Sequence, residues 1–134
     1  MGRQAMRLLL DTHAVFWALT DPDRIPKATR DLITDQTVTV LVSPISAYEM
    51  AHFHRLGKMP EATVLLPRFE QHIRDMGATE LSLATSHALV AGQLAWPHRD
   101  PFDRLLAAQA IGDNCHLVTC DPAFATLPGL MTLW

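Results

Sequence analysis

Cysteine is scarce in this chain of 134 residues: Cys115 and Cys120 are the only two, and they do not form a Cys-x-x-Cys pair. A disulfide framework and a thiolate zinc site are therefore not expected, and both thiols are predicted to be reduced. The histidines do not supply the missing ligands. His52 and His54 are two positions apart, so they would point to nearly opposite sides of a helix.

Long hydrophobic runs are also missing. A membrane-spanning helix needs about 20 apolar residues. The apolar run at residues 8–10 ends at Asp11, and it is also too short for a secretion signal. We therefore expect a cytoplasmic chain with no membrane partner. It is expected to form a single domain over residues 1–134, with residues 1–6 as a disordered extension.

The chain lacks an excess of positive charge. Its 14 acidic and 11 basic residues give a formal net charge of −3. This balance argues against a protein that coats nucleic acid by bulk positive charge, although it leaves room for a local basic groove. With 49% hydrophobic and 19% charged residues, the composition is that of a folded domain and not of a disordered chain.

Short apolar runs alternate with helix-forming segments along the sequence. Strands are expected at residues 7–10, 37–42, 79–83, 116–119 and 130–133. Helices are expected at residues 13–19, 26–33, 43–56, 60–76 (interrupted or restarted near Pro67), 86–94 and 101–111. This alternation predicts an α/β fold with a mostly parallel sheet of four to five strands and helices on both faces. In such sheets, ligands bind beyond the carboxyl ends of the strands.

Four acidic residues stand out against this pattern. Asp11 and Asp121 follow predicted strands, whereas Glu49 and Asp103 lie within otherwise apolar helices. Asp100 is three residues before Asp103, so both can face the same side of the helix. Carboxylates in apolar surroundings are costly unless they are paired or bind a metal. Oxygen ligands without thiolates favour Mg²⁺ or Mn²⁺, and the chemistry implied is hydrolysis of a phosphodiester.

Each acid alone also has a structural explanation. Asp11 can cap the following helix, and Glu49 can face solvent. Asp103 can favour the helix dipole or pair with a neighbouring arginine, and Asp121 with the proline after it can begin a turn. The combined pattern of all four favours a site.

Four segments of the chain carry a family resemblance: LLLDTHAVFWAL (8–19), VSPISAYEMAHFHRLGKM (42–59), HRDPFDRLLAAQA (98–110) and LVTCDPAF (117–124). The third is the most specific. Together they make the chain similar to the PIN-domain ribonucleases, and within them to the VapC-like toxins of type II toxin–antitoxin modules. The resemblance implies a PIN-like fold and an endoribonuclease that hydrolyses RNA phosphodiester bonds through a water activated by Mg²⁺ or Mn²⁺.

The resemblance also assigns roles to residues. The catalytic and metal-binding acids would be Asp11, Glu49, Asp103 and Asp121, with Asp100, Thr119 and Ser46 in support. The implied partners are RNA, a cognate VapB-like antitoxin and a second copy of the chain, with residues 14–19 and 48–53 near the protein interfaces. The basic residues considered for RNA contacts are Arg55, Lys58, Arg99 and Arg104. Arg55 and Lys58 can equally well serve the helix C-terminus that they flank.

Two other functions compete with this interpretation. A phosphatase with an aspartyl nucleophile usually needs a second Asp two residues after the first, and His13 occupies that position. A non-catalytic binding module with the same fold is expected to have lost at least one central acid, and all four are present.

Overall fold

The structure is a computed structural model and describes residues 6–134. The expected N-terminal extension lies outside this part except for its last residue, Met6. The Met6 carbonyl oxygen accepts a hydrogen bond from the Thr39 backbone N–H at 2.9 Å.

The centre of the fold is a five-stranded sheet in the order β3-β2-β1-β4-β5. Its strands are β1 (Arg7–Leu10), β2 (Thr39–Val42), β3 (Thr79–Glu80), β4 (His116–Val118) and β5 (Thr132–Leu133). All four pairings are parallel, so the carboxyl ends of the strands lie at one edge of the sheet. The predicted α/β fold with a mostly parallel sheet is confirmed.

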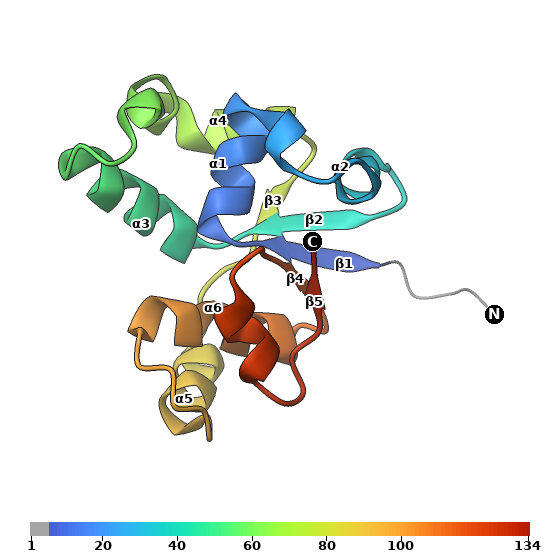
Figure 1. Ribbon diagram of the computed structural model, residues 1–134, viewed down its shortest axis with the longest axis vertical. Helices are drawn as coiled ribbons and strands as arrows, with labels where there is room; N and C mark the ends of the chain where they lie inside the picture. The colour runs from blue at the N-terminus through green and yellow to red at the C-terminus, as the bar shows by residue number, and fades with distance from the viewer. Residues whose placement is uncertain (1–5) are drawn as a thin grey trace.

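Helices cover both faces of the sheet (Figure 1). One face carries α1 (Thr12–Thr20), α2 (Lys27–Thr34), α3 (Pro44–Arg55) and α4 (Phe69–Asp75), and the other carries α5 (Thr85–Gln93) and α6 (Pro101–Gly112). Alternate residues of β1 serve the two cores: Leu8 and Leu10 pack into the first, and Leu9 packs into the second. Burial on both faces explains why this strand is apolar throughout. Within residues 6–134, no helix is both long enough and apolar enough to cross a membrane.

Some elements are shorter than the sequence predicts. The segment 60–76 restarts after Pro67, but its first part forms two 3₁₀ helices, η2 (Pro60–Val64) and η3 (Leu66–Arg68), ahead of α4. Proline fixes its own φ and has no N–H to donate, so it favours the start of a new short helix. The strand expected at 37–42 begins at Thr39, because the Thr37 N–H donates to the Asp35 carboxylate in a turn at 2.8 Å. Two further 3₁₀ helices are η1 (Pro22–Arg24) and η4 (Pro122–Thr126).

Candidate active site

Two acids reach the candidate site from neighbouring strands. Leu10 and Val118 are register partners in β1 and β4, and the Asp11 N–H extends this pairing by donating to the Val118 carbonyl at 3.0 Å. Asp121 follows β4 at the same edge of the sheet, and its N–H donates to the Thr119 hydroxyl oxygen at 3.0 Å. The parallel topology therefore places both acids beside each other, as expected for a ligand site in an α/β sheet.

Two helices supply the other acids. Glu49 lies on α3 and Asp103 in the first turn of α6, and each helix begins at a proline that directly follows its N-cap residue. Asp100 is the N-cap of α6, and its carboxylate accepts from the Phe102 N–H at 2.9 Å. All five acids line one cavity of about 210 Å³. The same cavity is lined by Thr12, His13, Phe53, Leu106, Cys120 and Phe124.

Asp11 also caps a helix. Its Oδ1 atom accepts from the Ala14 N–H at 2.8 Å, which satisfies one of the free donors at the start of α1. The side chain is nevertheless buried at the base of the acidic cavity, with only 8% of its surface exposed. Capping uses one oxygen of the carboxylate, so the structural role and a role in the site coexist.

Thr12 is a site residue that the sequence analysis missed. Its buried hydroxyl donates to Glu49 Oε1 at 2.6 Å and lies 3.2 Å from the Ser46 hydroxyl. Ser46 was expected to orient a carboxylate, and the structure connects it to Glu49 through Thr12. The position of Thr12, directly after Asp11 at a strand end, was the available signal.

The partner of Asp103 is a histidine. His98 Nε2 lies 2.7 Å from Asp103 Oδ2, so the structure shows a histidine where one structural alternative had a neighbouring arginine. The His98 ring is itself positioned by Trp96, with ring centroids 4.8 Å apart. His98 therefore fixes the orientation of the Asp103 carboxylate.

Arg104, which is predicted to contact RNA, uses its guanidinium to bind the backbone of a nearby loop. Its guanidinium donates at 2.8–3.0 Å to the backbone carbonyls of Ala91, Leu94, Trp96 and His98. These bonds fasten the loop between α5 and α6, which carries His98. The other candidates, Arg55, Lys58 and Arg99, are exposed and stand outside the lining of the acidic cavity. The proposed contacts of all four residues with RNA remain predictions.

Burial gives three of the acids unusual protonation behaviour. It raises the pKa of Asp11 above its ordinary value. It raises the pKa of Glu49 to about 6; neighbouring carboxylates add to this rise, and the hydrogen bond from Thr12 opposes it. Burial also raises the pKa of Asp103, opposed by the hydrogen bond from His98. Burial therefore disfavours the ionised form of all three carboxylates, and the charges of neighbouring acids add to this effect.

The chemistry of this donor set fits a hard divalent cation. Within residues 6–134, no lysine or arginine forms an ion pair with the five acids. A cation bound among these oxygens would relieve their mutual repulsion. In the described part of the chain, however, no three Asp, Glu, His or Cys side chains lie close enough to share an ion as they stand. Each of the five carboxylates instead has a hydrogen-bond partner of its own.

Replacing Glu49 by Gln is expected to stabilise the metal-free protein near neutral pH. The folded state raises the pKa of Glu49 from 4.5 to about 6, so its contribution to stability is full below pH 4.5 and is lost as the pH rises through 6. Glutamine keeps an oxygen for Thr12 but carries no charge. Because Glu49 is partly exposed, we expect a gain of about 1 kcal/mol in the free energy of unfolding above pH 7.

Urea unfolding of wild type and Glu49→Gln in EDTA, above pH 7 and again below pH 4.5, measures this effect. The exposed Glu61→Gln serves as the matched charge removal. A stability change for Glu49→Gln that is the same at both pH values would contradict the raised pKa.

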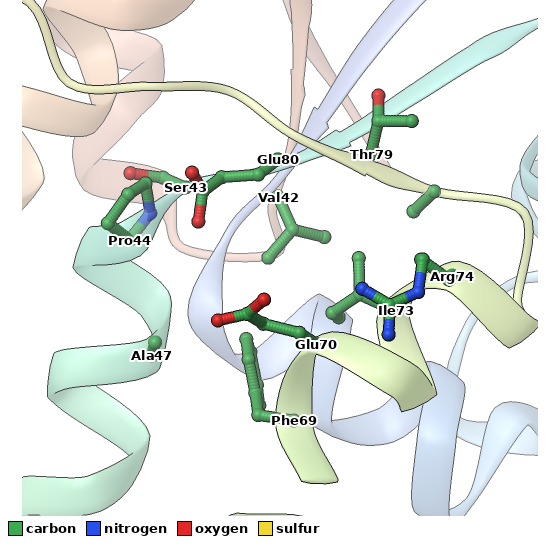
Figure 2. A pocket seen from close by; sticks show the side chains of 11 residues that line it. Val42, Ser43, Pro44, Ala47, Phe69, Glu70, Ile73, Arg74, Thr79 and Glu80 are labelled. Carbon is green, nitrogen blue, oxygen red and sulfur yellow. The ribbon is translucent and has the colours of Figure 1, made fainter.

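A second cavity of the molecule does not suit the same chemistry. This cavity of about 320 Å³ lies between α3, α4 and the ends of β2 and β3 (Figure 2). Its floor includes Val42, Phe69 and Ile73, and the acids that line it, Glu70 and Glu80, are exposed. Exposed carboxylates beside an apolar floor keep their hydration and do not require a cation. The smaller acidic cavity is therefore the candidate active site.

The fold and the pocket together define a class: α/β proteins that hold a cluster of carboxylates at the carboxyl edge of a parallel sheet. The chain belongs to the PIN-domain family, because residues 8–130 match the sequence profile described as PIN domain. It is also 31% identical to Ribonuclease VapC22 of Mycobacterium tuberculosis (strain ATCC 25618 / H37Rv) over 132 residues, which are 95% of this chain and 98% of that protein. The family resemblance in the sequence is confirmed.

Solved structures agree on the fold. VapBC2 from Rickettsia felis, bound to a DNA fragment from its promoter, contains a chain that matches with a TM-score of 0.71 and 19% identity, covering 96% of this chain and 98% of that one. FitAcB from Neisseria gonorrhoeae contains a chain that matches with a TM-score of 0.69 and 22% identity, covering 95% of this chain and 96% of that one. At these identities the comparison supports the architecture alone.

Proposed function

We propose that this protein is an Mg²⁺- or Mn²⁺-dependent endoribonuclease and the toxin of a type II toxin–antitoxin system. The observation that carries the proposal is the acidic cavity, in which Asp11, Glu49, Asp103 and Asp121 meet from four separate elements. The relative with 31% identity is a ribonuclease by name, and it aligns over nearly the full length of both chains.

The residues have distinct tasks in this mechanism. Asp11 and Asp103 would hold the metal, and Glu49 and Asp121 would complete its surroundings directly or through water. A bound Mg²⁺ or Mn²⁺ supplies polarisation of the phosphate and a lowered pKa for the attacking water. Thr12 and His98 hold the carboxylates of Glu49 and Asp103 in defined orientations. The backbone at the end of β1 fixes Asp11.

The partners follow from the same family membership. We infer an RNA substrate, a cognate VapB-like antitoxin and a homodimer, and a cytoplasmic location where RNA is available. Two of the structural relatives are VapBC assemblies bound to DNA, VapBC2 from Rickettsia felis and VapBC from Salmonella typhimurium. Those assemblies support the antitoxin as a partner for this chain.

Metal removal is expected to stop RNA cleavage. The purified protein should cut RNA in Mg²⁺ or Mn²⁺ and lose at least about 100-fold in rate in EDTA, because the carboxylates alone cannot polarise a phosphate. The products should carry 5′-phosphates, and a small phosphate monoester should not be turned over. The rates are measured by gel electrophoresis of labelled RNA, with metal added back as the control.

In cells, sequencing of new RNA 5′ ends after induced expression identifies the target. Discrete new ends and growth arrest are expected. Turnover of the small phosphate monoester without cleavage of RNA would favour a phosphatase. A rate of RNA cleavage that is unchanged in EDTA would contradict a metal-dependent mechanism.

A further inference from the structure

A third cavity, open and about 500 Å³ in volume, lies at the loop between α5 and α6. We call it the arginine cavity; it is lined by Gly92, Trp96, Pro97, His98, Arg99 and Arg104. None of these lining residues is acidic, whereas five acids line the candidate active site. Pockets of about 300–1,000 Å³ are the usual size for small-molecule ligands. The arginine cavity is therefore a candidate ligand site whose charge is opposite to that of the active site.

The positive charge of this cavity is not neutralised by the protein. Arg104 is half-buried, and its four hydrogen bonds go to backbone carbonyls, which carry no net charge. These bonds use four of the five N–H groups of the guanidinium and leave one on Nη2 without an acceptor among the described residues. Within residues 6–134, neither Arg99 nor Arg104 forms an ion pair. Uncompensated charge that is partly withdrawn from water favours an anionic ligand.

The remaining wall of the arginine cavity is flat and rigid. The Trp96 indole is almost fully buried, and its N–H donates to Thr126 Oγ1 at 2.9 Å. The His98 ring packs against Trp96, with centroids 4.8 Å apart. Fixed rings, a proline and a planar guanidinium are surfaces on which a flat aromatic ligand packs. Two positive charges beside such a wall are the recognition chemistry of a nucleotide, which joins a phosphate to an aromatic base.

The arginine cavity is separate from the candidate active site but adjoins it. The two cavities share no lining residue. His98 lies between them, because it lines the arginine cavity and its Nε2 atom lies 2.7 Å from Asp103, which lines the acidic one. Arginines attract a phosphate by their own charge, whereas a phosphate among carboxylates needs a bound cation. Binding at the arginine cavity should therefore not depend on metal.

We propose that the arginine cavity binds a nucleotide through its phosphate, independently of any metal. The phosphate accepts hydrogen bonds from Arg99 and from the remaining N–H of Arg104, and the base packs against the wall that Trp96 and Pro97 provide. Such a nucleotide has two sources: a free mononucleotide, or one unit of an RNA chain that is cut in the acidic cavity. The second source rests on the proposed function, and the first does not.

The test measures binding of AMP in EDTA to the full chain carrying Asp11→Asn, which keeps any added RNA intact. Binding is followed by the indole N–H signals in heteronuclear NMR spectra. The chain has three tryptophans, Trp17, Trp96 and Trp134, and Trp96→Phe assigns the signal of the cavity. Adenosine, which lacks the phosphate, is the matched ligand.

Two substitutions on α5 supply the matched protein variants. Gly92→Met fills the cavity, because Gly92 lines it and a Cβ atom at this position would meet no described atom within 4 Å. Ala88→Met adds the same side chain one turn earlier, at an exposed position outside the lining. Arg99→Met removes one of the two charges without filling the cavity.

Millimolar AMP should shift the Trp96 signal, and adenosine should bind at least about tenfold more weakly. Gly92→Met should weaken AMP binding at least about tenfold and Arg99→Met about fivefold, whereas Ala88→Met should bind like the parent. The proposal is overturned if AMP does not shift the Trp96 signal or if Gly92→Met binds AMP like the parent. It is also overturned if AMP binds only after Mg²⁺ is added, because the nucleotide would then lie among the acids.

An RNA oligomer added to the AMP complex distinguishes the two sources. Displacement of AMP assigns the cavity to a unit of RNA, and AMP that stays bound assigns it to a free mononucleotide. Cleavage by protein that retains Asp11 is measured separately. AMP binding without any cleavage would contradict the proposed endoribonuclease and leave the nucleotide site standing, whereas cleavage without AMP binding would do the reverse.

Discussion

Asp11→Asn is expected to abolish RNA cleavage, with a loss of about 1,000-fold or more in kcat. The substitution removes the negative charge from the most buried carboxylate of the cavity, at the point where β1 leads into the site. Asparagine still offers an oxygen to the Ala14 N–H, so the cap of α1 survives. The fold should therefore remain while the metal loses a charged ligand.

Three measurements distinguish this outcome from simple unfolding. Circular dichroism and urea unfolding should show that Asp11→Asn is folded, and cleavage of labelled RNA in Mn²⁺ should show the loss of rate. Asp23→Asn removes a carboxylate that is 90% exposed in η1, beyond the C-terminal end of α1, and it should cleave like wild type. Undiminished cleavage by Asp11→Asn that persists in EDTA would refute the proposed mechanism.

Arg104→Met is expected to destabilise the protein by about 3 kcal/mol. Methionine roughly preserves the length of the apolar stem but removes the donors that satisfy four backbone carbonyls. Those carbonyls lie at the end of α5 and in the loop that leads to α6, so the loop should loosen. Because this loop carries His98, the Asp103 carboxylate should also lose its fixed orientation.

The matched variant is Arg99→Met, which removes an exposed guanidinium from the same loop. It should leave the free energy of unfolding within about 0.5 kcal/mol of wild type. Urea unfolding measures both variants, and RNA binding by the folded proteins measures any contact with substrate. If Arg104→Met were as stable as wild type and bound RNA more weakly, the structural role of Arg104 in the loop would be contradicted and its predicted contact with RNA would be supported.

The acids were predictable because their positions follow from local pattern and sheet topology. A polar residue directly after a buried strand lies at the carboxyl edge of a parallel sheet, and this rule located Asp11 and Asp121. Glu49 and Asp103 were conspicuous as charges within apolar helices. The sequence could not supply the orientation of the Glu49 and Asp103 side chains, because each orientation is set by a hydrogen bond from another element or loop.

The arginines show where sequence reasoning fails. Arg99 and Arg104 flank the same short motif and are chemically alike. Arg99 is exposed, whereas the guanidinium of Arg104 donates to backbone carbonyls between Ala91 and His98. Only the path of the loop decides between these states, since a guanidinium binds a phosphate or a ring of carbonyls by the same donors. The exposure of Tyr48 beside Phe102 was equally beyond prediction, because it depends on how closely α3 and α6 approach.

The sequence by itself determined the order of strands and helices along the chain, the parallel sheet and the four acids that are candidates for the site. Those features depend on hydrophobic periodicity and chain connectivity, which are properties of residues close together along the chain. The tertiary structure alone decided that Thr12 and His98 orient the carboxylates, that Arg104 fastens a loop and that the Tyr48 ring of α3 packs against the Phe102 ring of α6. These assignments depend on contacts between segments far apart in the sequence, where distance and burial select one partner among several that are chemically equivalent.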